Sequence, residues 1–262
     1  MKQITLDTDN YQLPANWNEL TTEQLVFLLS LVNRKTSIQE IKTKIFLFCL
    51  QAHIGSKHLS HTFTMVIGKR KYPVSAGQLT ALSDSFDYLF SHPDENGNYS
   101  LEPKLTRNPF PTTKCGCITV CGPDDGLTNI TYDQFIMLQT YQQRIATHPS
   151  AIDELISIIY KRNIFKPESP GEPAIIKQMS PTVKTAILWF YLGTLQFLSG
   201  KFPRVFSGGG EPSGTSAFES QMKILDTLAE GDVTKKNTVR NSLLYDALFT
   251  MEFAIERQEK MK

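Results

Sequence analysis

The feature that most constrains the fold of this sequence is a recurring helix-start pattern, and three of its copies precede clear helical stripes of apolar residues. Each of these copies places a Ser or Thr three residues before a Glu or Gln: Thr21 with Gln24, Ser37 with Glu40, and Thr131 with Gln134. In this pattern the hydroxyl accepts a backbone hydrogen bond from the third residue, whose side chain returns one. Apolar residues at helical spacing follow each copy, so we expect amphipathic helices that pack against one another.

The segment from residue 91 to residue 126 interrupts these helical patterns. It is rich in Pro, Gly and Asn, and its Asn96-Gly97 pair is a turn signal. Two β-prone runs at 62–67 and 71–74 precede it and flank Gly68, which predicts a hairpin. Residues Cys115 to Cys121 are expected to form one further strand. The predicted fold is therefore predominantly α-helical (α+β): a helical bundle with a small antiparallel β-hairpin or β element in residues 60–121.

A glycine-rich stretch in the last quarter of the chain predicts a domain boundary. Residues 207–216 read SGGGEPSGTS, a composition typical of flexible linkers. We expect residues 1–206 to form the main helical domain, which contains the hairpin and the irregular 91–126 segment. Residues 217–262 are expected to form a C-terminal helical pair.

Charge and hydropathy exclude several classes of protein. The chain has 27 Lys and Arg against 26 Asp and Glu, a net charge of +1, which excludes a nucleic-acid binder that relies on bulk positive charge. The longest apolar stretch without a charge runs from residue 185 to residue 199, shorter than the ~20 residues of a bilayer span. The first residues do not resemble a signal peptide. We expect a soluble protein made in the cytoplasm, with no membrane partner.

Three of the four cysteines lie close together in the sequence. Cys115, Cys117 and Cys121 have the spacing C-x-C-x3-C, and thiolates are preferred ligands of zinc. A fourth ligand would come from Cys49, His53, His58 or His61. On a single strand, however, all three cysteines share one face and can pack there as small apolar residues. We predict no cofactor, and a zinc site remains the alternative.

Two other local patterns suggest ligands. Lys69, Arg70 and Lys71 form a basic patch at the predicted hairpin tip that could touch phosphates, although exposed tips are also charged for solubility. Residues 94–98 begin like a calcium loop, but Tyr99 occupies the position that requires Gly and Leu105 the position that requires Glu. The zinc-protease, serine-hydrolase and phosphate-loop motifs are absent from the sequence, so we predict that the protein is not an enzyme.

Several segments carry a family resemblance. They are LPANWNELT (13–21), RNPFP (107–111), GPDDGLTNIT (122–131) with the helix that follows, LISIIYKR (155–162) and ILWFY (187–191). This series resembles uncharacterised proteins of phages and integrated elements of Bacteroidetes-type bacteria. Residues 217–262 resemble the ends of small helical phage tail-assembly or tail-structural proteins.

The resemblance implies a non-enzymatic phage virion-assembly or structural protein. It would be tail-related, either tail-assembly chaperone-like or a tail or neck component. It would act in the cytoplasm of the bacterial host or be incorporated in the virion. Its partners would be other phage structural or assembly proteins, with a homo-oligomer left open. The alternative function is a zinc-binding regulatory or nucleic-acid-contacting module that uses Cys115, Cys117 and Cys121.

The C-terminal helical pair supplies the predicted contact residues. An amphipathic pair on a flexible tether can lay its apolar face into a groove of a partner. The residues that we predict for this contact are apolar and lie at helical spacing: Phe218, Met222, Leu225, Val239, Leu243 and Met251. The opposing hypothesis is that this pair packs on the core of its own chain.

Overall fold

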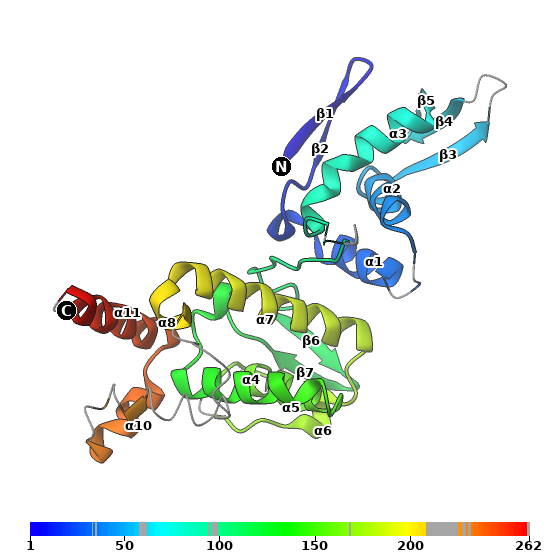
Figure 1. Cartoon of the computed structure of the whole chain (residues 1–262). Coiled ribbons are helices and arrows are strands. Elements are labelled where there is room, and N and C mark those ends of the chain that lie inside the picture. The colour runs from blue at the N-terminus through cyan, green and yellow to red at the C-terminus, as the bar shows by residue number, and fades with distance from the viewer. Residues whose placement is uncertain are drawn as a thin grey trace. The chain divides into compact units, whose positions relative to one another are not determined.

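The structure is a computed structural model in which two compact units, Met1–Pro103 and Lys104–Lys262, are distinguished (Figure 1). It describes residues 1–32, 34, 36–57, 62–93, 95, 99–167, 169–207, 225–226, 229 and 232–260. The sequence predicts one main domain over residues 1–206, and this stays a prediction beside the division at residue 103. The predicted linker at 207–216 lies outside the described residues except for Ser207.

In its described residues, the first unit combines two small sheets with three α-helices and two short 3₁₀ helices. Its strands are β1 (Lys2–Leu6), β2 (Asp9–Leu13), β3 (Ala52–Lys57), β4 (Thr62–Ile67) and β5 (Arg70–Ser75). Its helices are η1 (Trp17–Glu19), α1 (Thr22–Val32), α2 (Ile38–Cys49), α3 (Ala76–Ser83) and η2 (Asp84–Leu89). Strands β1 and β2 pair with each other, and β3, β4 and β5 form an antiparallel sheet in that order.

The local signals read from the sequence explain the helices of this unit. The Thr21 hydroxyl accepts a hydrogen bond from the backbone N–H of Gln24, whose side chain accepts one from the Thr21 N–H. Helix α1 then buries Leu25, Leu28 and Leu29. It packs against α2, where the Phe27 and Phe48 rings stack with centroids 4.1 Å apart. The predicted hairpin at Gly68 is confirmed by the pairing of β4 with β5.

The second unit is built on a three-stranded sheet and a group of helices. Its strands are β6 (Thr112–Cys115), β7 (Ile118–Cys121) and β8 (Lys161–Arg162), antiparallel in that order. Its helices are η3 (Asp125–Leu127), α4 (Tyr132–Ile145), α5 (Ala151–Ile159), α6 (Pro173–Ile176), α7 (Pro181–Lys201), α8 (Pro203–Ser207), α10 (Val233–Asn241) and α11 (Leu244–Lys260). Helix α5 packs against α4, α6 and α7.

A buried polar network joins the hairpin β6–β7 to the end of α5. The Tyr160 hydroxyl lies 2.9 Å from Asn108 Oδ1 and 3.0 Å from the Phe110 carbonyl oxygen. The Asn108 amide donates to the Pro123 carbonyl at 2.7 Å. Gly122 is required beside this network, because a Cβ there would lie 2.6 Å from Tyr160 Cζ. Burial raises the pKa of Tyr160, so its hydroxyl keeps its proton and serves as a donor.

The predicted fold class is wrong in its β content. Instead of a helical bundle with one hairpin, the described residues form three small antiparallel sheets, and the fold is mixed α+β. In the pair β1–β2, Ile4, Leu6, Tyr11 and Leu13 alternate with polar residues, a period-two strand pattern that the prediction overlooked. The expected single strand from Cys115 to Cys121 is two strands, because Gly116 turns the chain with φ +60°.

The long apolar segment near residue 190 is an internal helix. Helix α7 buries Ile187, Phe190, Tyr191 and Leu198. No helix among the described residues is sufficiently long and apolar to span a bilayer. An ion pair between two largely buried side chains ties α7 to α5, with Lys184 Nζ 2.6 Å from Asp153 Oδ1.

We predict that Gly122→Ala destabilises the second unit by about 1–3 kcal/mol, because the new methyl group overlaps the Tyr160 ring and the Asn108 amide. Gly200→Ala in α7 is the matched control, since a Cβ there meets nothing within 4 Å. Urea unfolding of both variants measures the difference. An equal effect of the two substitutions would contradict the close approach at Gly122.

Asp153→Asn is expected to lower the free energy of unfolding by about 3–5 kcal/mol, because it leaves the Lys184 ammonium buried without its carboxylate. The two side chains are 10% and 14% exposed. Glu172→Gln is the control, since its ion pair with Arg162 is about half exposed and should contribute ~0–1 kcal/mol. The same unfolding experiment compares them, and a cost for Asp153→Asn no larger than that of the control would refute the prediction.

Candidate interaction site

The start of α11 is held against the rest of the second unit by hydrogen bonds. Leu243 forms a β-bridge with Thr131 at the start of α4, and the Leu244 N–H donates to the Ile130 carbonyl at 3.0 Å. The Tyr245 hydroxyl donates to the Gly126 carbonyl, also at 3.0 Å. These contacts fix where α11 begins and which of its faces turns inward.

A carboxylate on α11 holds the neighbouring helix α8. The two oxygens of Glu252 accept hydrogen bonds from the backbone N–H groups of Arg204 and Val205, at 3.4 and 3.2 Å. These N–H groups belong to the first turn of α8, where a helix favours negative charge. The Arg204 guanidinium adds ion pairs to Glu252 and Glu259. Helices α8 and α11 are therefore joined by charge as well as by packing.

Helix α11 has one buried face and one exposed aromatic face. Leu244, Ala247, Leu248 and Met251 recur at helical spacing and are at most 6% exposed. Along another side of the helix, Tyr245, Phe249 and Phe253 follow one another at intervals of four residues. Phe249 is 45% exposed and Phe253 is 58% exposed.

Lys201 at the end of α7 extends this aromatic surface. Its ammonium lies 5.8 Å from the centroid of the Phe197 ring, 4.9 Å from that of Tyr245 and 5.7 Å from that of Phe249. Such distances are those of cation–π contacts. Phe197 is itself 48% exposed. We call Phe197, Lys201, Tyr245, Phe249 and Phe253 the aromatic face.

The residues predicted as partner contacts fall in different environments. Phe218 and Met222 lie outside the described residues. Leu225 and Met251 are buried, Val239 is half-buried and Leu243 is 46% exposed. Their role in binding stays a prediction.

The expected apolar stripe through Val239, Leu243 and Met251 required one continuous helix. The chain instead breaks at Ser242 between α10 and α11. The break changes which residues share a face, and sequence reasoning therefore missed the aromatic face. The spacing of Tyr245, Phe249 and Phe253 was the signal that could have found it.

The three clustered cysteines lie on one hairpin but in different environments. Cys115 is fully buried at the end of β6, Cys117 is exposed in the turn, and Cys121 on β7 donates to the Asn163 carbonyl at 2.9 Å. Among the described residues no group of three side chains is arranged to hold a metal ion. Cys49 and His53 belong to the first unit, while His58 and His61 lie outside the described residues.

The predicted basic patch lies at the β4–β5 turn, as expected. Lys69, Arg70 and Lys71 are all exposed. Arg70 forms an ion pair with Asp9 of the β1–β2 hairpin, and the Tyr72 hydroxyl donates to the same carboxylate. This pairing neutralises one of the three positive charges, which reduces the attraction of the patch for phosphates.

We predict that thiol reagents at pH 8 modify Cys117 far faster than Cys49 or Cys115. The thiolate is the reactive form, and burial raises the pKa of Cys49 to about 12 and also raises that of Cys115. Alkylation followed over time by peptide mass spectrometry measures the three rates. Equal rates would contradict the assigned burial, and joint protection of Cys115, Cys117 and Cys121 by one equivalent of zinc would support the metal site instead.

Comparison with known proteins adds no family to this description. No protein-family model matches the chain, and neither a curated protein nor a solved structure gives a match. Any functional conclusion therefore rests on the residues and contacts of this chain and on the resemblance of its segments.

Proposed function

We propose that this protein is a non-enzymatic phage assembly or structural protein, tail-related, that acts through protein–protein contacts made by the aromatic face. The resemblance of its segments to phage proteins supports the setting. The exposure of three phenylalanines on adjoining parts of α7 and α11 supports the mode of action.

The physical case rests on the cost of leaving this surface in water. Clustered exposed apolar side chains on a protein that stays in solution commonly mark a binding site. Aromatic residues are enriched in the centres of interfaces, where a few of them supply most of the binding free energy. The rings are also positioned by packing, since the Phe202 and Phe249 centroids are 5.0 Å apart in an edge-to-face arrangement. A partner would therefore meet a preformed surface.

The charge of the aromatic face indicates what kind of partner fits it. Lys201 places one positive charge among the rings. A two-fold contact between two copies would bring the same patch, and hence two like charges, together. A different protein that presents apolar side chains beside an Asp or Glu complements both features. We therefore place the contact with another phage protein rather than with a second copy of this chain.

Replacement of the two outermost rings tests this function. In a phage from which the gene is deleted, we expect the double variant Phe197→Ser and Phe253→Ser to fail to restore complete particles, as counted by electron microscopy. Loss of the aromatic residues that dominate an interface typically costs about 2 kcal/mol or more, roughly thirty-fold in affinity.

Ile164→Ser is the matched control, because Ile164 is 64% exposed and outside the aromatic face. Both variants should accumulate and melt like the wild-type protein. Restoration of particles by the double variant at wild-type yield would refute the proposed contact.

A further inference from the structure

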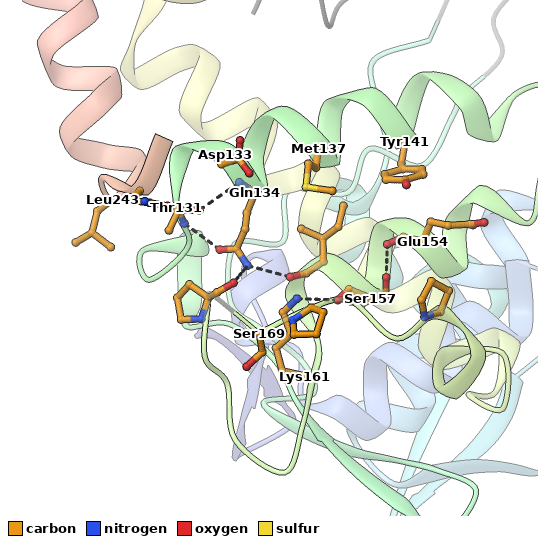
Figure 2. A pocket seen from close by; sticks show the side chains of 16 residues that line it. Thr131, Asp133, Gln134, Met137, Tyr141, Glu154, Ser157, Lys161, Ser169 and Leu243 are labelled. Atoms are coloured by element: carbon orange, nitrogen blue, oxygen red, sulfur yellow. Dashed lines mark hydrogen bonds between the residues drawn. The ribbon is translucent and has the colours of Figure 1, made fainter. Parts of the chain in front are cut away.

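A groove runs between α4 and α5 on the second unit (Figure 2). Asp133, Met137 and Tyr141 line it from α4 at intervals of one helical turn, and Ser157 and Lys161 line it from the α5 side. Its volume is about 730 Å³. Sites for small organic ligands have volumes of ~300–1,000 Å³, so the groove is large enough for such a molecule or for the end of a peptide.

The loop between β8 and α6 forms one wall of this groove. Pro167, Pro170 and Pro173 restrict its backbone, and Gly171 brings it against α5. A Cβ at Gly171 would lie 2.7 Å from Ser157 Oγ and 3.1 Å from the Ser157 carbonyl oxygen. The wall is therefore held next to the last turn of α5, where Lys161 is placed.

Lys161 is buried, and among the described residues its ammonium uses one of its donors. The residue is 5% exposed, and its ammonium donates to the Ser157 carbonyl at 3.1 Å. An ammonium has three donors. No other hydrogen bond from this group is made within the described part of the chain. The carbonyl of Ile158 is satisfied separately by the Gln134 amide at 3.0 Å.

Two acidic side chains near the groove, Glu172 and Asp133, pair with arginines, whereas one carboxylate oxygen of Glu154 is buried without a hydrogen-bond partner among the described residues. Glu172 is the charge that acts most on Lys161, but its carboxylate pairs with Arg162 at 3.3 Å. Asp133 lies 3.7 Å from Arg240 Nε, and Glu154 also lines the groove. Burial lowers the pKa of Lys161 to about 8, because desolvation outweighs the attraction of Glu172.

We propose that this groove is a binding site for a carboxylate group, which pairs with the Lys161 ammonium. One lysine balances one negative charge, and a buried cation gains most from a partner that fills its remaining donor positions. Asp133 and Glu154 in the groove wall, together with the negative end of α5, disfavour a phosphate with its higher charge. The carboxylate belongs either to a small acid or to the C-terminus of a peptide.

The test follows the reactivity of Lys161 in the wild-type chain. Amine acylation at pH 8, measured by peptide mass spectrometry, is compared with and without acetate, succinate, a tripeptide with a free C-terminus and the same tripeptide amidated. Sodium chloride keeps the ionic strength constant. A bound carboxylate stabilises the charged, unreactive ammonium, so we expect at least a five-fold slower acylation of Lys161 and no change at exposed Lys69.

The pattern of protection identifies the source of the carboxylate. Slowing by the small acids indicates a metabolite-sized ligand, whereas slowing by the free-acid tripeptide alone indicates a peptide C-terminus. No slowing by any acid, or equal slowing by the amidated tripeptide, overturns the proposal.

A second measurement uses Lys161→Met and Lys161→Arg. Calorimetry with the protecting acid should show binding to the arginine variant and loss of binding to the methionine variant. Equal binding to the methionine variant would place the carboxylate elsewhere. The groove and the aromatic face have no residue in common. Failure of carboxylate binding would therefore not affect the proposed function, which is tested by the aromatic-face variants.

Discussion

The second unit depends on the buried hydroxyl of Tyr160. This group and the Asn108 side chain connect the segment before β6, the segment after β7 and the end of α5 through hydrogen bonds of 2.7–3.0 Å. Since buried polar groups are costly when unpaired, the three segments are stable only together. Glycine at position 122 gives the ring its space. The segments 107–111, 122–131 and 155–162 meet here, so the fold accounts for part of their composition.

Both surfaces that we assign to binding follow from this arrangement. Residue 160 directly precedes β8, whose pairing with β7 places Lys161 beside the last turn of α5. The chain segment around Gly126, which follows β7, accepts the hydrogen bond from Tyr245 and thereby fixes the start of α11. With that start fixed, α11 buries its aliphatic residues and leaves Phe249 and Phe253 exposed. The groove and the aromatic face therefore share one structural support.

Local signals predicted the elements that depend on neighbouring residues. The capping boxes at Thr21 and Thr131 form, and so does the hairpin at Gly68, because each needs only residues close in sequence. The hairpin β1–β2 is equally local, and the alternation of its apolar residues was overlooked, whereas the third sheet also needs a distant strand. Strand β8 has two residues and exists only through its pairing with β7, about forty residues earlier in the chain. The break between α10 and α11 at Ser242 was also not predicted, because the apolar residues on both sides of it fit one continuous helical pattern.

The candidate sites were less predictable than the fold, because they are formed by residues that are distant from one another in the sequence. The groove combines residues from α4, α5, β8, the proline-containing loop and the connection between α10 and α11, and none of these segments carries a ligand-binding motif alone. Lys161 stands out only when its burial is known. The clustered cysteines, which do stand out in the sequence, occupy a buried strand end, an exposed turn and a half-buried strand position.

Site-specific photocrosslinking from position 253 would show whether the aromatic face binds another protein. A photoreactive phenylalanine there replaces the most exposed ring of the aromatic face without removing its bulk. In cells that produce the phage to which the protein is proposed to belong, we expect a crosslink to one virion or virion-assembly protein, with none from the same group placed at position 164. Crosslinks confined to a second copy of this chain, or equal from both positions, would contradict it.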